Sequence, residues 1–327
     1  MHTNVQRTLK KTLFLLFIRF FFARREPVRL ELSYSDLDAE RYPRREVRFP
    51  SCGRMLDGCL YRAPSARGVI VIVHGFRGCA ESHLGEMMRF VDGGWDVFTF
   101  DATGTRGSEG RSLRGLQQIK YDLIAAVEYL AGEEETSGLP VVLYGHSMGA
   151  YAAAAVLGRV RVAAAVCVAG FNAPVDTMRF QVRRYGGIPA CVDIPLLYLH
   201  SRIVFGRDAN ASALDAINAT DTPVLIVQGT RDDVVPERIS IYSHLPEITN
   251  PNTDVLTVSD EYRSGHSTLW LTQEAARYLL ARKAELTKLR TLRARRRYSQ
   301  EFDRRPLADT DDGYVRTVLD FCRRSVE

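Results

Sequence analysis

The chain has 327 residues, 46% of them hydrophobic and 25% charged, and its formal net charge is +5 at pH 7. Such a length can bury a sizeable core, and these fractions are ordinary for a globular protein. The six cysteines lack the close pairing or the spacing of a metal cluster. We therefore expect reduced thiols in a cytoplasmic protein, although Cys52 and Cys59 could face each other across a hairpin.

The first apolar stretch, residues 13–22, is too short to cross a bilayer comfortably and is interrupted by Arg19. Two lysines precede it, two arginines follow it, and it lacks the small-residue cleavage site of a signal peptide. Two interpretations are open. The stretch is either a helix docked on the protein's own surface or an in-plane membrane anchor whose basic flanks meet anionic headgroups.

Strand and helix patterns alternate through the middle of the chain. A polar linker is expected at residues 26–45, and a β-branched run at 68–73 is typical of a strand buried on both faces of a parallel sheet. The other expected strands are 45–50 and 55–62 (antiparallel, with Gly53 near their turn), 95–100, 140–144, 160–169, 222–228 and 254–258. Helices are expected at 81–92, 116–130, 150–157 and from 272 onward. This alternation predicts an α/β fold whose mostly parallel sheet is covered on both faces.

Residues 172–221 interrupt the alternation, and we interpret them as a cap inserted over the site. The expected organisation is an apolar N-terminal segment and linker (1–44), a core in two parts (45–171 and 222–284) around the cap (172–221), and a basic C-terminal extension (285–327).

The C-terminal part is strongly basic. Eight lysines and arginines lie between residues 282 and 297, against the single acid Glu285. The expected helix there is either solvated beyond the core or a surface for anionic lipid that acts together with residues 13–22. Nucleic acid is not an expected partner, because no recognised fold or aromatic interleaving accompanies the charge.

The most informative stretch is Gly145-His146-Ser147-Met148-Gly149, which matches G-x-S-x-G. This pattern is a sharp strand-to-helix turn that holds a serine hydroxyl clear of the backbone, ready to attack a carbonyl. The context fits, because residues 140–144 read as a buried strand and residues 150–157 as a helix. Ser147 is therefore the candidate nucleophile.

A nucleophilic serine needs a base, and the base needs an orienting carboxylate, in the chain order serine, acid, histidine. Asp232 and Asp233 follow a buried strand, at the edge where catalytic groups gather in open α/β sheets, and either can be the acid. His266 lies in the loop after the last strand and is the candidate base. His200 in the cap and His244 are less able to reach Ser147.

The oxyanion formed during acyl transfer needs two backbone N–H donors. We expect one from Met148, at the start of its helix, and one from Phe76, in the loop after the strand at 68–73. His74 is then structural. No Asp, Glu or Cys arrangement supports a zinc site with it, and the glycine-rich loop 101–110 lacks the pattern of a phosphate loop.

Together these motifs resemble the α/β-hydrolase superfamily, and most closely its serine aminopeptidase and monoacylglycerol-lipase-like branch, which includes bacterial esterases. The resemblance covers residues 45–284. It rests on residues 74–76, the loop 101–110, the elbow at 145–149, residues 229–236 and Gly265-His266. It implies the α/β-hydrolase fold and selects Asp232 over Asp233, because the family pattern G-x-x-D-x-x-V-P fits residues 229–236. The departures lie at both ends and in the cap.

The expected function is that of a serine hydrolase that needs no cofactor and cleaves a small-molecule carboxylic ester through an acyl-enzyme. The acyl group would be short, medium or aromatic, in an ester that could derive from lipid. A peptidase or amidase of the same fold, or a non-catalytic binding protein, is the alternative. Side chains of the cap that could contact substrate are Ile188, Leu196, Leu197, Tyr198 and Phe205, with Arg179, Arg183 and Arg184 either beside them or solvating the outer face.

Overall fold

The computed structural model describes residues 22–24, 28–185 and 190–327. Nearly all of the apolar stretch 13–22, and Ile188 of the expected cap, therefore lie outside the described residues. Within the described part, no helix is long and apolar enough to cross a bilayer.

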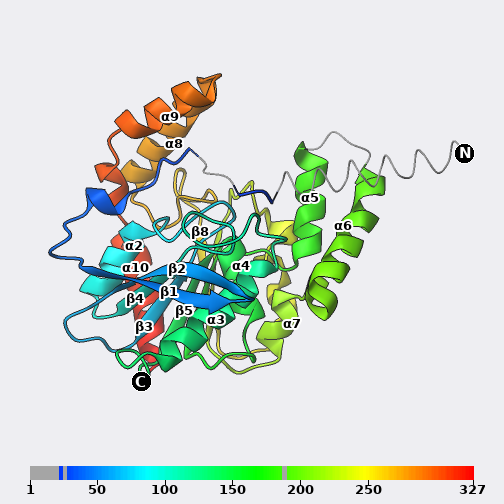
Figure 1. The fold of residues 1–327 in the computed structure, drawn as a ribbon, viewed down its shortest axis with the longest axis horizontal. Coiled ribbons are helices and arrows are strands. Elements are labelled where there is room, and N and C mark those ends of the chain that lie inside the picture. The colour runs from blue at the N-terminus through cyan, green and yellow to red at the C-terminus, as the bar shows by residue number, and fades with distance from the viewer. Residues whose placement is uncertain (1–21, 25–27, 186–189) are drawn as a thin grey trace, which may run out of the picture.

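Eight strands form one sheet in the part of the chain that the structure describes (Figure 1). They are β1 (Arg44–Ser51), β2 (Arg54–Tyr61), β3 (Val69–Val73), β4 (Asp96–Phe100), β5 (Val141–His146), β6 (Ala164–Val168), β7 (Val224–Gly229) and β8 (Thr253–Val258). Their order is β1-β2-β4-β3-β5-β6-β7-β8. Strand β2 pairs antiparallel with β1 and with β4, and the other neighbouring pairs are parallel. The predicted mostly parallel sheet is confirmed.

The β1–β2 hairpin shows why its turn falls where it does. Cys52 and Gly53 adopt φ angles of 48° and 73°, the left-handed pair that a tight two-residue hairpin turn requires. Cys59 lies opposite Glu46 on β1 and not opposite Cys52. Both cysteines are free thiols, so they do not face each other across the hairpin.

Helices cover both faces of the sheet. They are α2 (Leu84–Asp92), α3 (Gln118–Gly132), α4 (Met148–Ala155), α5 (Pro174–Tyr185), α6 (Ala190–Phe205), α7 (Ala213–Asn218), α8 (Gln273–Lys288), α9 (Leu292–Glu301) and α10 (Asp312–Arg324). Short 3₁₀ turns are η1 (Tyr34–Asp36), η2 (Gly206–Asn210), η3 (Glu237–Ile239), η4 (Tyr242–Glu247) and η5 (Arg305–Ala308).

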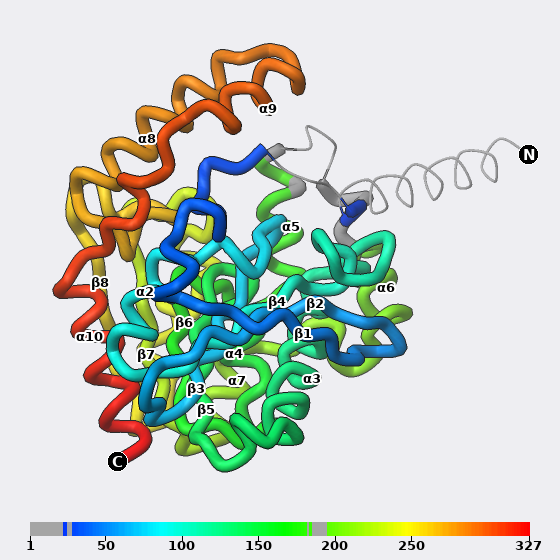
Figure 2. Tube along the Cα trace, turned by 60° about the vertical axis from the view of Figure 1, so that its left-hand side comes forward, coloured from blue at the N-terminus to red at the C-terminus, as the bar shows by residue number. Residues whose placement is uncertain are grey.

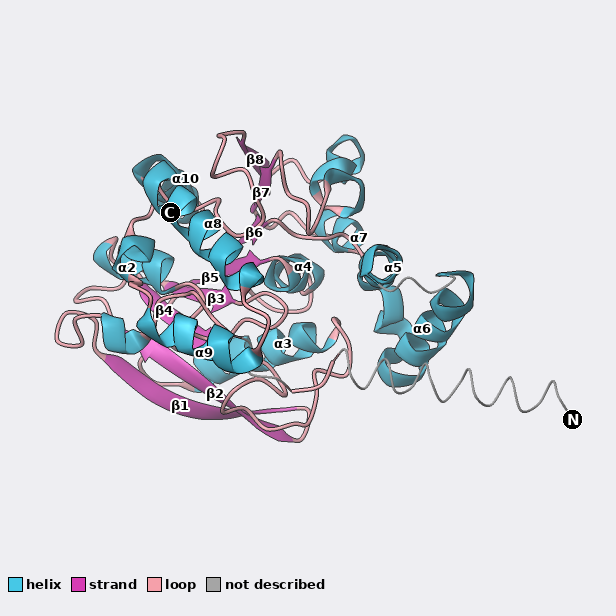
Figure 3. Ribbon diagram, turned by 90° about the horizontal axis from the view of Figure 1, so that it is seen from above, coloured by secondary structure: helices cyan, strands magenta, loops and turns pink. Residues whose placement is uncertain are grey.

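Alternate side chains of β3 divide the core into two layers. Val69, Val71 and Val73 pack with α3, α4 and α7, while Ile70 and Ile72 pack with α2, α8 and α10. Successive strand residues point to opposite faces, so this run has to be apolar at every position. Figure 3 shows α2 and α10 on one side of the sheet and α3 and α4 on the other.

Residues 172–221 form α5, α6, η2 and α7. Helices α5 and α6 stand to one side of the sheet (Figure 1), whereas Ala213 and Ile217 of α7 are buried in the core beside α4. Asp208 of η2 anchors the segment, because its carboxylate lies 2.9 Å from Lys120 Nζ and 2.7 Å from Arg159 Nη2. Part of the segment is thus core, and its role as a cap stays a prediction.

The linker expected at residues 26–45 is largely packed against the body of the protein, so that prediction is wrong for its described part. Leu30, Leu32 and Tyr42 are buried in the layer that holds α2, α8 and α10. The backbone there is also tied to α9, because Ser299 Oγ donates a hydrogen bond of 2.6 Å to the Arg29 carbonyl. Isolated leucines in a polar stretch carry no periodicity, so this packing could not be predicted from the sequence.

The single helix expected from Thr272 through Arg297 is two helices. α8 ends at Lys288, and the Thr291 side chain caps α9 by accepting from the Ala294 N–H. Figure 2 shows α8 and α9 side by side, and Tyr298 donates to Glu285 across them at 2.5 Å. The arginines of α9 are exposed or partly exposed, and membrane association through them stays a prediction.

Helix α10, in the expected C-terminal extension (285–327), packs in the core. α10 buries Val318, Phe321 and Cys322 in the same layer as α2. Its Tyr314 hydroxyl lies 2.8 Å from the hydroxyl of Tyr144 on β5, the strand that leads to Ser147. Residues 312–324 are thus part of the support of the site.

Candidate active site

Ser147 lies between β5 and α4 in a backbone conformation that few residues adopt. Its φ and ψ angles are 57° and −112°. The Ser147 N–H donates to the Val168 carbonyl at 2.8 Å, and the Ser147 carbonyl accepts from the Tyr151 N–H at 3.1 Å. These bonds hold a strained turn between strand and helix. Strain of this kind persists where the surroundings over-determine it, typically at functional sites.

The two glycines of the elbow are required by space. A Cβ on Gly145 would lie 2.2 Å from the Gly149 carbonyl oxygen, and a Cβ on Gly149 would lie 2.0 Å from the Val73 carbonyl oxygen. Both distances are far inside van der Waals contact, so a side chain at either position would force β3, β5 and α4 apart. The close approach places Ser147 at the end of β5 and beside the end of β3, where the strand order of the sheet reverses.

His266 and Asp232 form a hydrogen-bonded pair. His266 Nδ1 donates to Asp232 Oδ2 over 2.7 Å, and the Asp232 side chain is almost fully buried. Asp232 Oδ1 accepts from the N–H groups of Val234 and Val235 at 2.9 and 2.8 Å, so the carboxylate is fixed from both sides. With its proton on Nδ1, His266 keeps Nε2 as a base.

The other candidates from the sequence lie elsewhere. Asp233 is exposed and pairs with Arg184 at 2.9 Å. His244 is bonded to Glu247 and Asn172, and His200 approaches the Arg114 carbonyl from α6. His266 lines the same cavity as Ser147, and Asp232 is hydrogen-bonded to His266.

The Phe76 and Met148 backbone lies next to Ser147. Residues 75–78 form a tight turn in which the Gly78 N–H donates to the Gly75 carbonyl at 2.9 Å and Arg77 has a φ of 63°. A Cβ on Gly75 would lie 3.2 Å from Ser147 Cβ, which shows how closely this turn approaches the serine. Met148 is the first residue of α4, so the positive end of the helix dipole faces the site.

His146 braces the loop that carries His266. Its Nε2 donates to the His266 carbonyl at 2.8 Å, and its ring centroid lies 4.8 Å from that of His266 and 5.0 Å from that of Trp270. Burial, together with the neighbouring His266 and His83, holds the pKa of His146 well below its usual range. The ring therefore stays neutral and acts as a spacer. The sequence motif named His146 only as the variable residue of the elbow.

His74 is structural, as its environment shows. Its Nδ1 donates to the Gly75 carbonyl at 2.7 Å, and its Nε2 accepts from the Ala102 N–H at 3.1 Å. This pattern requires the neutral ring, because a proton on Nε2 would face another N–H. Burial lowers the pKa of His74 to about 4 from 6.5.

We expect the free energy of unfolding to decrease as the pH falls from about 6.5 to about 4. The unfolded chain protonates His74 in this range while the folded chain does not, so the stabilisation is complete above the unfolded pKa and is lost toward the folded one. The loss should approach about 3 kcal/mol. Urea unfolding at several pH values checks it: the stability gap between wild type and His74→Gln should shrink as the pH falls. A gap that does not change with pH, as expected for the control His200→Gln, would contradict the assignment.

A cavity of about 720 Å³ opens over Ser147. One wall comes from α5 and the loop after β7, through Met178, Gln181 and Val235. The opposite wall comes from residues 28–32, Trp270 and α8. A volume of this size suits a small-molecule ligand. The second wall was not predicted, because it is assembled from segments that lie far apart in the sequence.

None of the described cap side chains that were expected to contact substrate lines this cavity. Arg179 and Arg183 line a separate hollow on the surface together with Arg184, Leu197 is buried in the core, and Phe205 stacks on Tyr121. Tyr198 is 47% exposed. Among the described residues, no group of three or more His, Cys, Asp or Glu side chains could hold a metal ion.

Comparison with known proteins finds relatives in sequence and in fold. Residues 64–187 match the family described as serine aminopeptidase, S33, a stretch that includes Phe76 and Ser147 but ends before Asp232. The mouse (Mus musculus) alpha/beta hydrolase domain-containing protein 17C is 24% identical over 229 residues. That alignment covers 68% of this chain and 62% of the mouse protein, so less than two thirds of the relative is represented.

Two solved structures share the fold. An esterase from Pyrococcus furiosus has a TM-score of 0.59 at 16% identity, and the match covers 93% of this chain and 100% of that one. An acylaminoacyl peptidase from Pyrococcus horikoshii has a TM-score of 0.55 at 19% identity, over 72% of this chain and 40% of that one. At such identities the likeness establishes the fold alone.

Proposed function

We propose that this chain belongs to the α/β-hydrolase superfamily, in the branch of the serine aminopeptidases. It is then a serine hydrolase that cleaves a carboxylic ester through an acyl-enzyme on Ser147. The observation that carries the proposal is the buried Asp232–His266 pair, which opens into the same cavity as the strained Ser147. The names of the relatives include both an esterase and a peptidase, so they support hydrolysis more than they support either substrate.

The reaction begins when His266 Nε2 takes the proton of the Ser147 hydroxyl as Oγ attacks the acyl carbonyl carbon. The hydrogen bond between such a hydroxyl and its base often tightens only in the complex with substrate. The carbonyl π electrons move to oxygen, and the resulting oxyanion accepts from the N–H groups of Phe76 and Met148. Each donor is worth about 3 kcal/mol in comparable sites.

The tetrahedral intermediate collapses when the bond to the alcohol oxygen breaks. His266 Nε2 returns its proton to that oxygen, and the alcohol leaves an ester on Ser147. Water then enters, gives a proton to His266 and attacks the acyl carbon, and the carboxylic acid is released as Ser147 recovers its proton. Asp232 keeps the imidazole in the correct tautomer and stabilises its charged form throughout.

The test is hydrolysis of p-nitrophenyl esters of increasing acyl length, with the p-nitroanilide of the best acyl group in parallel. We expect kcat/KM to peak at a medium length and to fall about tenfold toward long chains, because the cavity is bounded. Faster cleavage of the anilide than of the ester would favour the amidase alternative. No turnover above the uncatalysed rate for either class would overturn the proposed function in favour of a binding protein.

A further inference from the structure

The wall that α8 contributes to the cavity is apolar except for one cation. Leu279, Lys283 and Leu286 lie four and three residues apart, so they share one face of the helix, and all three line the cavity that contains Ser147. Lys283 is partly buried there, whereas Lys288, one turn beyond, is exposed. Lys283 therefore faces the cavity and is only partly exposed to solvent.

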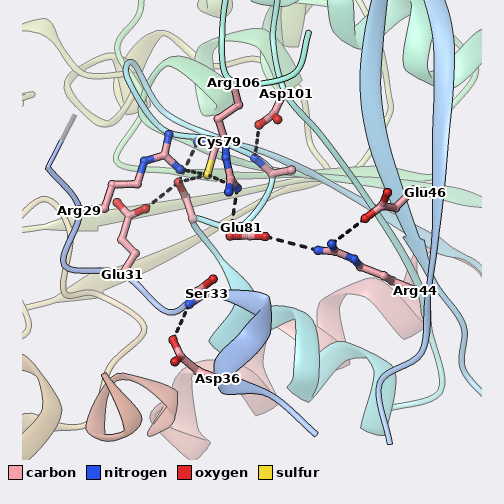
Figure 4. A network of polar contacts seen from close by, with 12 residues as sticks. Arg29, Glu31, Ser33, Asp36, Arg44, Glu46, Cys79, Glu81, Asp101 and Arg106 are labelled. Carbon is pink, nitrogen blue, oxygen red and sulfur yellow. Dashed lines mark hydrogen bonds and ion pairs between the residues drawn. The ribbon is translucent and has the colours of Figure 1, made fainter. Parts of the chain in front are cut away.

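The anionic groups on this side of the cavity are engaged elsewhere. Glu31, on the facing wall, accepts from Ser82 Oγ at 3.0 Å, and no carboxylate of a described residue lies within ion-pair distance of Lys283. Arg29, the other cation of that wall, donates to Cys79 Sγ (Figure 4). Lys283 is thus the charged group of this wall that lacks a partner among the described residues.

The surroundings of Lys283 disfavour its charged form, and its charge in turn acts on His146 of the elbow. Burial lowers the pKa of Lys283, and the more distant Glu31 and Asp233 offset only part of that effect. After burial and the neighbouring histidines, the charge of Lys283 is a further cause of the lowered pKa of His146. An unpaired ammonium in such a place gains most from an anionic ligand.

We propose that Lys283 binds a carboxylate carried by the substrate, so that the ester hydrolysed at Ser147 is a half-ester of a dicarboxylic acid or a similar anionic ester. This inference rests on the proposed function and deepens it. The cavity that Lys283 lines also contains the apolar side chains of Trp270, Leu271 and Leu279, so an aliphatic spacer joins the carboxylate to the scissile carbonyl. Lys283 fixes the far end of that spacer and sets its length.

The first experiment compares mono-p-nitrophenyl esters of dicarboxylic acids with neutral p-nitrophenyl esters of equal length. The ratio of kcat/KM for the best anionic ester to that for its neutral counterpart should fall about tenfold or more in Lys283→Met. Lys283→Arg should keep most of the ratio, and the exposed control Lys288→Met should keep all of it. An unchanged ratio in Lys283→Met, in an enzyme that hydrolyses the neutral esters, would overturn the inference and leave the proposed function standing.

The second experiment measures binding without turnover. Monomethyl adipate, which carries one ester and one carboxylate, is titrated into Ser147→Ala and followed by the fluorescence of Trp270, which lines the cavity. We expect saturable binding that weakens about tenfold or more when Lys283→Met is added, with dimethyl adipate as the neutral comparison. Equal binding of the two esters, or an equal effect of the substitution on both, would contradict the inference even if the protein hydrolysed no ester at all.

Discussion

Ser147→Ala is expected to lower kcat for ester hydrolysis by about 10⁴- to 10⁶-fold, because it removes the only atom that forms the acyl-enzyme. The backbone should not change. Alanine and serine are equally disfavoured at a φ of 57°, so the substitution leaves the backbone strain of the elbow unchanged and the fold is retained. Steady-state kinetics with the best p-nitrophenyl ester, alongside thermal unfolding, separate loss of chemistry from loss of structure.

A second substitution at the same position sharpens the result. Ser147→Gly should be as inactive as Ser147→Ala but more stable, because glycine adopts positive φ without penalty. Ser243→Ala, on the surface turn η4, is the matched control and should keep wild-type activity. If Ser147→Ala kept a tenth or more of the activity, the nucleophile would have to be another group.

Asp232→Asn is expected to lower kcat by about 10⁴-fold, with little loss of stability. Asparagine retains the oxygen that accepts from the N–H groups of Val234 and Val235, but its amide can present N–H to His266 Nδ1. That contact favours the tautomer with the proton on Nε2, which cannot take the proton of Ser147. Kinetics of the variant at several pH values would measure the loss.

Asp233→Asn is the matched control, because it changes the neighbouring carboxylate in the same way. The Asp233 side chain is 71% exposed and contacts Arg184. The activity of Asp233→Asn should therefore stay within about twofold of wild type. The reverse outcome, an active Asp232→Asn beside an inactive Asp233→Asn, would show that the acid has been assigned to the wrong residue.

The parts of the fold that could be predicted are those that local sequence dictates. The β-branched run of β3 predicts a buried strand, and the glycines at 145 and 149 predict a tight turn. Each prediction depends on a steric or burial requirement of only a few neighbouring residues. The expected chain order of serine, acid and histidine selected Asp232 and His266 as partners of Ser147, although the three residues follow different strands of the sheet. The pairing of His266 with Asp232 follows from strand ends that meet at one edge.

The parts that could not be predicted depend on contacts between distant segments. Leu30 and Leu32 sit in a polar stretch, and only the presence of α8 and α9 over them makes that stretch part of the cavity wall. Lys283 belonged to a basic run whose other members are mostly exposed, so its inward direction had no signature in the sequence. Helix α8 ends at Lys288, and Thr291 caps the next helix, α9. The capping role of Thr291 is recognisable only when the structure shows that a new helix begins there.

The central claim is that Ser147 carries the acyl group, and covalent trapping tests it most directly. The protein is incubated with a fluorophosphonate, and the adduct is located by intact mass and peptide mapping. We predict one phosphonate per chain, on Ser147, with no labelling of Ser147→Ala and much slower labelling of Asp232→Asn. A chain that remains unlabelled, or one labelled equally in wild type and Ser147→Ala, would contradict the claim.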